Sequence, residues 1–491
     1  MLDSSSPPWA HVAQGCFLVL LSLVFLPLDT FVLLFSRLLI RDPASVRARH
    51  GPGAPTVSKT ILVTGVSMTK GLALARTLYL AGHVVIGADF EPDGVPVNGR
   101  YSRSLKKFFT VTVPTPANGS ATYLHQLLTI VQQEKVDLWI SCSSLESSTA
   151  DGQAAQMIEA QSGCRAVQFG GGLTKTLHEK DSFMKYAADL GLATPETHRV
   201  DSRAAVHQVL QDAGEKRFIL KSIDTDLTTR GDLTLLPRPT PSETYQHLST
   251  LDISPSSPWI LQRFIRGREY CSHAMIVQND VRVFVACPSS EMVMHYAALA
   301  PDSVLSRAMQ EYTQMLVSRS NESMNGHLSL DFLVEDERDK PTLYPIECNP
   351  RPHTAVVLMQ TSPRAVSDAY LSVLEHGTSD TVRRADEYPT PVVVPTRPMP
   401  CYWIGHDLVS LVLVPLFQLL SRGTSMRAFI ASIRVFISHL LTWREATFEL
   451  WDPLPWWWMY HVYWPAKFLL AIRDGRRWNR VNLSTTRMFP C

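Results

Sequence analysis

The sequence has almost no excess of charge of either sign. Its 46 basic and 45 acidic side chains leave a formal net charge of +1. A protein that binds DNA or RNA needs a basic face to neutralise phosphates, so this balance argues against a nucleic-acid partner. Paired cysteines are also missing: the eight cysteines are scattered and none forms a Cys-x-x-Cys pair. The sequence therefore indicates neither a zinc site nor a disulfide framework, and we expect reduced thiols.

Two common nucleotide-binding signatures are incomplete. Residues 63–65 followed by Gly71 look like the start of a dinucleotide-binding unit, but the middle glycine of that motif is absent. The Tyr-x-x-x-Lys pattern of short-chain dehydrogenases occurs only at residues 463–467, where Pro465 disfavours the required helix. The same glycine turn is not a P-loop, because Lys70 precedes the second glycine instead of following it. An NAD(P)-linked oxidoreductase is therefore a weak alternative.

One long apolar run is present near the start of the chain. Residues 16–40 read CFLVLLSLVFLPLDTFVLLFSRLLI, and about 20 apolar residues span a bilayer as a helix. Pro27 and Asp29 interrupt the run, so a kinked or shallow helix is an alternative. Residues 1–15 contain no Lys or Arg, whereas four arginines stand between residues 37 and 49. The positive-inside rule then predicts a single-pass membrane anchor with the part of the chain that follows it in the cytoplasm; a monotopic hairpin and a signal peptide are the alternatives.

The segment after the anchor has the pattern of a parallel α/β sheet. Residues 42–58 are rich in Pro, Gly and Ala and suit a linker. A strand at residues 60–63, a helix at residues 70–80 that ends at Gly82, and a strand at residues 84–88 form one βαβ unit. Such a unit implies a parallel sheet.

From about residue 175 the pattern changes to α+β, so the predicted fold class is α/β followed by α+β. The other expected elements are a helix at residues 181–189 and strands at residues 136–140, 218–221, 259–262, 273–277, 281–286, 328–333 and 343–347. We predict four parts: an anchor and linker at residues 1–58, a Rossmann-like domain at residues 59–174, a second domain at residues 175–375, and a helical region at residues 376–491.

The C-terminal region is rich in tryptophan. Eight of the eleven tryptophans lie within residues 401–491, and Trp and Tyr favour the headgroup layer of membranes. Residues 408–420 are apolar, but the run contains Pro415 and is short for a membrane span. We therefore expect this region to lie on a membrane surface, with lipid as a partner. The alternative is an ordinary apolar helical packing domain.

Four segments, in chain order, carry polar side chains suited to one nucleotide site. Lys180 opens a helix and Lys221 ends a strand, so they can supply separate positive charges to a triphosphate. Mg²⁺ prefers oxygen ligands and uses one or two carboxylates besides phosphate oxygens. Glu347 and Asn349 are two residues apart on an extended segment and face the same side. Asp331, on a neighbouring strand, can join them.

Further candidates flank this set. Arg351 follows Asn349 on the same side and can hold a phosphate in a fork. Gln262 and Glu269 flank a strand-to-turn joint, which suits contacts with adenine and with ribose hydroxyls. Three histidines can line the side of a second substrate, and the first choice among them is His353. These histidines are His273, His295 and His353.

With these residues in order and E-x-N-P-R last, the sequence resembles the ATP-grasp superfamily over roughly residues 60–375. Within it, the sequence resembles the mycosporine-glycine synthase group, and with the N-terminal run included this resemblance covers nearly the whole chain. The stretches that carry it are ILKSI at 219–223, ISP at 253–255, PWI at 258–260, LSLDF at 328–332, the turn at 68–70 and WDPLP at 451–455. The resemblance implies a Rossmann-like pre-ATP-grasp domain followed by an ATP-grasp domain. It also implies an enzyme of secondary-metabolite biosynthesis that uses ATP and Mg²⁺, with Mn²⁺ as an alternative, to join an amino acid such as glycine to 4-deoxygadusol, a cyclic enol-ketone.

The resemblance also implies a role for each candidate residue. It implies that Lys180 and Lys221 hold phosphates, that Gln262 and Ile265 contact adenine, that Glu269 contacts ribose, that Asp331, Glu347 and Asn349 bind Mg²⁺, and that Arg351 contacts the γ-phosphate or the intermediate. Two departures from the family pattern weaken this resemblance. The family usually has Glu where Gln262 stands, and its Gly-rich phosphate loop is absent, because residues 222–230 read SIDTDLTTR. A carboxylate–amine ligase with another acceptor and a non-catalytic membrane scaffold stay as alternatives.

Overall fold

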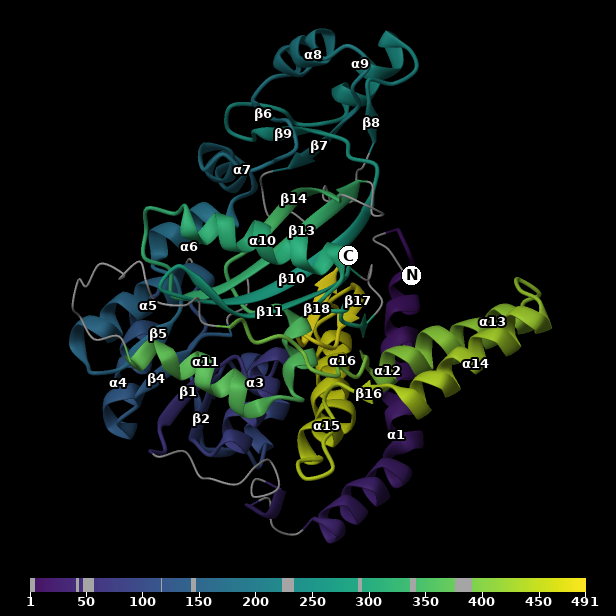
Figure 1. Cartoon of the computed structure of the whole chain (residues 1–491). Coiled ribbons are helices and arrows are strands. Elements are labelled where there is room, and N and C mark those ends of the chain that lie inside the picture. The colour runs from purple at the N-terminus through teal and green to yellow at the C-terminus, as the bar shows by residue number, and fades with distance from the viewer. Residues whose placement is uncertain are drawn as a thin grey trace.

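The computed structural model describes residues 5–40, 44–46, 57–115, 117–142, 147–222, 234–289, 294–335, 341–375 and 391–491 (Figure 1). The predicted parallel sheet is confirmed: five strands run parallel in the order β3-β2-β1-β4-β5. Gly82 ends α3 in the left-handed region, with φ of 114°, a conformation that glycine adopts without a steric penalty. The elements of this part are β1 (Thr60–Thr64), α3 (Thr69–Ala81), β2 (Val84–Asp89), η1 (Pro92–Gly94), η2 (Asn98–Tyr101), β3 (Leu105–Thr110), α4 (Ala121–Glu134), β4 (Leu138–Ile140), α5 (Ser148–Gln161), β5 (Arg165–Val167) and α6 (Gly171–His178).

Two antiparallel sheets follow, and the predicted α+β pattern is thus confirmed. The first has the order β6-β9-β7-β8 and the second the order β11-β10-β13-β14. Their elements are α7 (Lys180–Asp189), β6 (Thr197–Val200), α8 (Arg203–Asp212), β7 (Phe218–Ser222), β8 (Leu235–Leu236), α9 (Pro241–Ser249), β9 (Trp259–Arg263), β10 (Arg268–Val277), β11 (Asp280–Pro288), α10 (Val304–Ser318), β13 (Gly326–Glu335), β14 (Thr342–Asn349), η3 (Thr354–Met359) and α11 (Pro363–Glu375).

The joint between the two antiparallel sheets is tight at Gly267. A Cβ atom at this position would lie 2.2 Å from the carbonyl oxygen of Val334 on β13. Only glycine allows the chain that leaves β9 to approach β13 this closely before it enters β10. The joint therefore brings the end of β9 and the start of β10 beside the strands that carry the candidate carboxylates.

The C-terminal region packs against the parallel sheet domain. Arg76 on α3 is buried and its Nε donates to Asp452 Oδ2 at 2.9 Å, while Ser102 Oγ donates to the same oxygen at 2.6 Å. The elements are β12 (His295–Tyr296), which pairs with β15 (Cys401–Tyr402), then α12 (Ile404–Asp407), η4 (Leu408–Leu413), α13 (Val414–Leu420), α14 (Met426–Thr442), β16 (Arg444–Glu445), α15 (Leu454–Trp458), η5 (Met459–Tyr463), α16 (Trp464–Arg473), β17 (Trp478–Asn482) and β18 (Arg487–Pro490).

The tryptophans do not form the membrane-surface layer that we expected. All eight C-terminal tryptophans are buried or half-buried within the protein, which matches the packing-domain alternative for this part of the region. Trp464, for example, stacks on Phe468, which stacks on Trp478. Tryptophan suits both a core and a membrane interface, because it combines a large apolar ring with one N–H group. Composition alone therefore could not separate these two environments.

Exposed apolar side chains gather on two parts of the chain, residues 8–39 and residues 414–442. α1 (Pro8–Leu39) continues through Pro27 and is the one helix among the described residues that is long and apolar enough to cross a membrane. It runs along one side of the molecule, bends in its second half, and lies beside α16 (Figure 1). Asp29 does not end the helix, because Nε2 of His461 lies 2.8 Å from its carboxylate. The second element is the hairpin of α13 and α14, which projects from the molecule and exposes Phe417 and Leu441 (Figure 1).

Candidate nucleotide and metal site

The three predicted oxygen ligands lie on two neighbouring strands. Asp331 on β13 stands opposite Glu347 on β14, and the register shifts directly after Asp331. Asn349 ends β14, and its Nδ2 donates to Asp331 Oδ2 at 3.5 Å. The other amide atom, Asn349 Oδ1, is buried and has no hydrogen-bond partner. Two carboxylates and a spare amide oxygen match the hard oxygen ligands that Mg²⁺ prefers.

The electrostatics of Asp331 point to a missing positive charge. Burial, followed by the negative charges of Glu347 and Glu269, raises the pKa of Asp331 to about 8, while Arg351 and Lys180 oppose the shift. A carboxyl group in this state is costly to ionise unless a cation is close. The residues therefore fit a divalent cation at this position.

The two predicted lysines lie next to the carboxylates. Lys180 is the first residue of α7, and its Nζ is 3.4 Å from Glu347 Oε2. Lys221 lies on β7, and its Nζ donates to Gln262 Oε1 on the paired strand β9 at 2.7 Å. Burial and the charge of Lys180 lower the pKa of Lys221 to about 8. Two like charges held this close favour an anion between them.

The predicted adenine and ribose contacts lie at the joint of β9 and β10. Gln262 is only 3% exposed, and both ends of its amide are bonded, because Nε2 donates to Thr197 Oγ1 at 3.1 Å. It therefore holds Lys221 in place in this structure. Ile265 is buried, whereas Glu269 is exposed and accepts a hydrogen bond from Ser289 Oγ at 2.8 Å. The predicted phosphate loop at residues 222–230 lies outside the described residues except for Ser222.

Arg351 is half-buried just after β14. Its backbone N–H donates to Asn349 O at 2.8 Å, and Ser329 Oγ donates to its carbonyl oxygen at 3.1 Å. Burial lowers the pKa of its guanidinium group, and its Nη1 has no hydrogen-bond partner. A buried guanidinium nitrogen without an acceptor is costly, and an anionic oxygen placed there would satisfy it.

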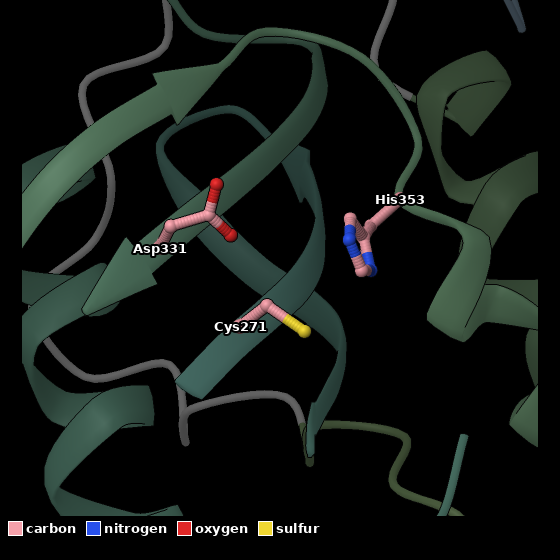
Figure 2. A group of neighbouring side chains, drawn as sticks. All are labelled: Cys271, Asp331 and His353. Atoms are coloured by element: carbon pink, nitrogen blue, oxygen red, sulfur yellow. The ribbon is translucent and has the colours of Figure 1, made fainter. Parts of the chain in front are cut away.

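His353 is the residue that precedes η3. Its backbone N–H donates to His273 Nδ1 at 3.3 Å, so two of the three candidate histidines meet. One ligand atom each from Cys271, Asp331 and His353 lies within 4.8 Å of the other two. Figure 2 shows Cys271 and Asp331 on neighbouring strands, with the ring of His353 facing them across a gap. The structure therefore brings His353 beside the carboxylate site.

His295 takes part in a different cluster. Its Nε2 donates to Asp407 Oδ1 at 2.7 Å, and His439 Nδ1 donates to Asp407 Oδ2 at 2.7 Å. These three residues come from β12, α12 and α14. His295 thus ties the C-terminal hairpin to the core, while its neighbour Tyr296 contacts the ring of His353.

Two residues at the site were not predicted. Lys70 lies at the start of α3, and its Nζ donates to the carbonyl oxygen of Pro352 at 2.9 Å. Burial and the charge of Arg351 lower the pKa of Lys70 to about 7. Cys271 is buried beside Asp331, and its Sγ lies 3.3 Å from that of Cys287. The only sequence signal for Lys70 was its place in the glycine turn, and a cysteine in an apolar strand looks like an ordinary core residue.

No family model matches the sequence, and no curated protein matches it. The structure is similar to the ADP complex of purK, an N5-carboxyaminoimidazole ribonucleotide synthetase, with a TM-score of 0.48, 12% identity, and coverage of 71% of this chain and 81% of that chain. It is also similar to N5-carboxyaminoimidazole synthase from Aspergillus clavatus in complex with ADP and 5-aminoimidazole ribonucleotide. The TM-score is 0.47 and the identity 13%, and the match covers 70% of this chain and 81% of that chain. An L-amino acid ligase from Bacillus licheniformis is similar too, with a TM-score of 0.45, 11% identity, and coverage of 64% of this chain and 75% of that chain.

Proposed function

We propose that this protein is an ATP-dependent ligase of the ATP-grasp type that forms a C–N bond. The observation that carries the proposal is the meeting of two lysines with a carboxylate pair. Lys180 contacts Glu347, and the charges of Lys180 and Glu347 act on both Lys221 and Asp331. Cations, carboxylates and unpaired polar atoms in one place suit a magnesium-bound triphosphate.

In this proposal each group has a role in positioning or neutralising charge. Lys180 and Lys221 hold phosphates, while Gln262 and Ile265 bound the adenine and Glu269 accepts ribose hydroxyls. Asp331, Glu347 and Asn349 hold Mg²⁺, which neutralises phosphate charge when bound. Arg351 and His353 follow β14, and the unpaired Arg351 Nη1 suits the γ-phosphate or the phosphorylated intermediate. The division into an anchor, a pre-ATP-grasp domain, an ATP-grasp domain and a C-terminal region belongs to the same proposal.

The proposed reaction has two steps. The γ-phosphoryl group passes from ATP to an oxygen of the acceptor, which releases ADP and turns that oxygen into part of a leaving group. The amine of an amino acid then attacks the activated carbon, phosphate leaves, and a C–N bond remains. The protein supplies orientation and charge stabilisation and no covalent intermediate of its own.

The acceptor is a finer part of the proposal. The sequence resemblance favours a cyclic enol-ketone such as 4-deoxygadusol, with glycine as the amino acid. A carboxylate acceptor is the alternative, because the residues around the triphosphate do not depend on the acceptor.

The exposed apolar faces of α1 and of the α13–α14 hairpin support attachment to a membrane, and we propose that the catalytic part faces the cytoplasm.

Product analysis tests the proposal. Purified full-length protein would receive ATP, Mg²⁺, an amino-acid mixture and either 4-deoxygadusol or a mixture of carboxylic acids. We expect ADP and phosphate to appear only when amine and acceptor are both present, together with a coupled product in mass spectrometry. Release of AMP and pyrophosphate would contradict the mechanism. A coupled product from the carboxylates alone would keep the ligase and exclude the cyclic acceptor.

A further inference from the structure

One face of α14 carries exposed apolar and basic side chains in alternation. The apolar members are Ile430, Ile437 and Leu441, which are 44%, 47% and 75% exposed. The basic members are Arg427 and Arg434, which are exposed as well. Neighbours in this series are three or four residues apart along the helix, so all five side chains lie on one face. This face, which we call the α14 stripe, is a candidate contact surface because large apolar side chains gather on it.

The charge of the hairpin has one sign. Residues 408–443 contain three arginines and no acidic residue. Arg422 stands in the turn between α13 and α14, and Arg427 and Arg434 belong to the α14 stripe. All three are exposed, and no side-chain ion pair or hydrogen bond holds any of them among the residues that the structure describes. The chain as a whole is nearly neutral, so this local excess favours a partner with negative charge.

The inner side of the hairpin is occupied by the protein itself. Ser432 Oγ of α14 donates to the carbonyl oxygen of Leu411 at 2.8 Å. Val409 and Phe436 line a cavity together with Leu21 of α1, so the base of the hairpin faces α1. From there the hairpin projects away from the body of the molecule (Figure 1). Its exposed apolar surface is therefore next to that of the proposed membrane anchor.

The length of α14 and the places of its arginines indicate how the hairpin meets a bilayer. α14 has 17 residues, which is about 25 Å of helix, whereas the hydrocarbon core of a bilayer is about 30 Å thick. A hairpin inserted tip first would carry Arg422 and Arg427 into the hydrocarbon, which is costly. A helix that lies in the membrane plane keeps Arg427 and Arg434 at the level of the head groups, while their alkyl stems run along the apolar surface.

We propose that α14 lies in the plane of one leaflet and that Arg427 and Arg434 bind the anionic head groups of its phospholipids. This inference rests on the membrane attachment in the proposed function and adds the class of lipid. Ile430, Ile437 and Leu441 supply the insertion, and each arginine supplies a preference of about fivefold for an anionic surface. Anionic lipids belong to the cytoplasmic leaflet, which agrees with the proposed orientation.

Fluorescence quenching by spin-labelled lipids tests this with the full-length protein in lipid nanodiscs. A nitrobenzoxadiazole dye is attached at Leu441→Cys, with the exposed Cys16 and the half-buried Cys491 replaced by Ser. The quencher is phosphatidylserine or phosphatidylcholine with the same nitroxide near the top of its acyl chain, so only the head group differs. We expect phosphatidylserine to reach half-quenching at a mole fraction lower by at least about threefold. A dye at Tyr245→Cys, an exposed site on α9, is the control and should be quenched by neither lipid.

The role of the arginines has a matched control. The double variant Arg427→Gln/Arg434→Gln should lose the preference for phosphatidylserine and keep its quenching by phosphatidylcholine, because the apolar side chains still insert. The double variant Arg217→Gln/Arg307→Gln removes the same charge from exposed arginines outside the hairpin and should keep the preference. Salt at about 1 M, where the Debye length is about 3 Å, should weaken the preference of the unchanged protein.

Each contrary result has a defined meaning. Equal quenching of residue 441 by the two lipids would overturn the head-group assignment. No quenching by either lipid would mean that water, another protein or a second copy covers the α14 stripe, and would overturn the docking. A dye on the native Cys16 of α1, with Leu441 unchanged and Cys491 replaced, reports the membrane attachment by itself. Quenching at Cys16 without quenching at residue 441 contradicts only this inference, whereas no quenching at either site contradicts the proposed attachment.

Discussion

Among the residues that the structure describes, two clusters of three His, Cys or Asp side chains have ligand atoms within 4.8 Å of one another: Cys271–Asp331–His353 and His295–Asp407–His439. They differ in how their charges are satisfied. In the second cluster, each oxygen of Asp407 accepts one histidine N–H at 2.7 Å, and the carboxylate is fully buried. In the first, Asp331 has a long contact of 3.5 Å with Asn349.

The difference separates a structural cluster from a site prepared for a ligand. The Asp407 cluster is closed, since its members pair with one another and hold the hairpin on the core. Around Asp331, burial raises the pKa to about 8 and nearby polar atoms lack partners. Such unpaired groups persist where a bound ligand or cation completes them.

The largest expected effect on activity is at the open cluster, which is the Cys271–Asp331–His353 cluster with its unpaired polar neighbours. Asp331→Asn removes a negative charge that the proposed Mg²⁺–ATP complex needs, and we expect ADP release to fall by about 10³-fold, or about 4 kcal/mol. The matched control is Glu335→Gln at the end of the same strand, which should stay within about threefold of the unchanged protein. Steady-state ADP release at saturating ATP and Mg²⁺, with amine and acceptor both present, measures both variants. Near-normal activity of Asp331→Asn would show that this cluster is not the metal site.

A substitution in the closed cluster, His295–Asp407–His439, should lower the stability of the protein. Asp407→Ala leaves the buried His439 and the half-buried His295 without their acceptor, so we expect a loss of about 3 kcal/mol in the free energy of unfolding. Turnover per folded molecule should stay unchanged. Asp93→Ala is the control, because Asp93 pairs with Lys467 at 2.6 Å near the surface and should cost at most about 1 kcal/mol. Thermal unfolding followed by circular dichroism measures both variants. Equal losses of unfolding free energy in Asp407→Ala and Asp93→Ala would remove the distinction between the closed and the open cluster.

The sequence predicted the local structure that carries the candidate site residues. The strand pair that carries Asp331 and Glu347 was expected from apolar runs, and its register places the two carboxylates opposite each other. Lys180 and Lys221 lie where a helix start and a strand end were predicted. These features depend on periodicity over a few residues, which a single sequence contains.

Long-range contacts were not predictable. Lys70 meets Pro352 across 282 residues, and Arg76 meets Asp452 across 376. The pairing of Asp29 with His461 spans 432 residues and explains an acidic residue inside an apolar helix. No local pattern encodes such pairs, because they arise only when separate elements pack. The buried tryptophans escaped prediction for the same reason.

A smaller effect is expected in the pH dependence of stability, through Lys70. Its pKa is about 7 in the folded protein against 10.5 for an ordinary lysine, because burial and Arg351 disfavour the charged form. Between these two values the unfolded chain binds more protons than the folded one, so folding stability rises with pH. From pH 7 to pH 8.5 the gain is about 2 kcal/mol, since each pKa unit is worth about 1.4 kcal/mol.

Lys70→Met isolates this contribution, because the variant keeps the apolar stem and removes the titrating group. Its unfolding temperature should lack the rise between pH 7 and pH 8.5, so the unchanged protein should gain stability relative to the variant across that window. Lys59→Met serves as the control, because Lys59 is a partly exposed lysine that pairs with Asp137 at 3.4 Å and should give a curve parallel to the unchanged protein. Parallel curves for Lys70→Met as well would mean that Lys70 stays charged, which would place a fixed positive charge beside Arg351 and strengthen the attraction of this site for an anion.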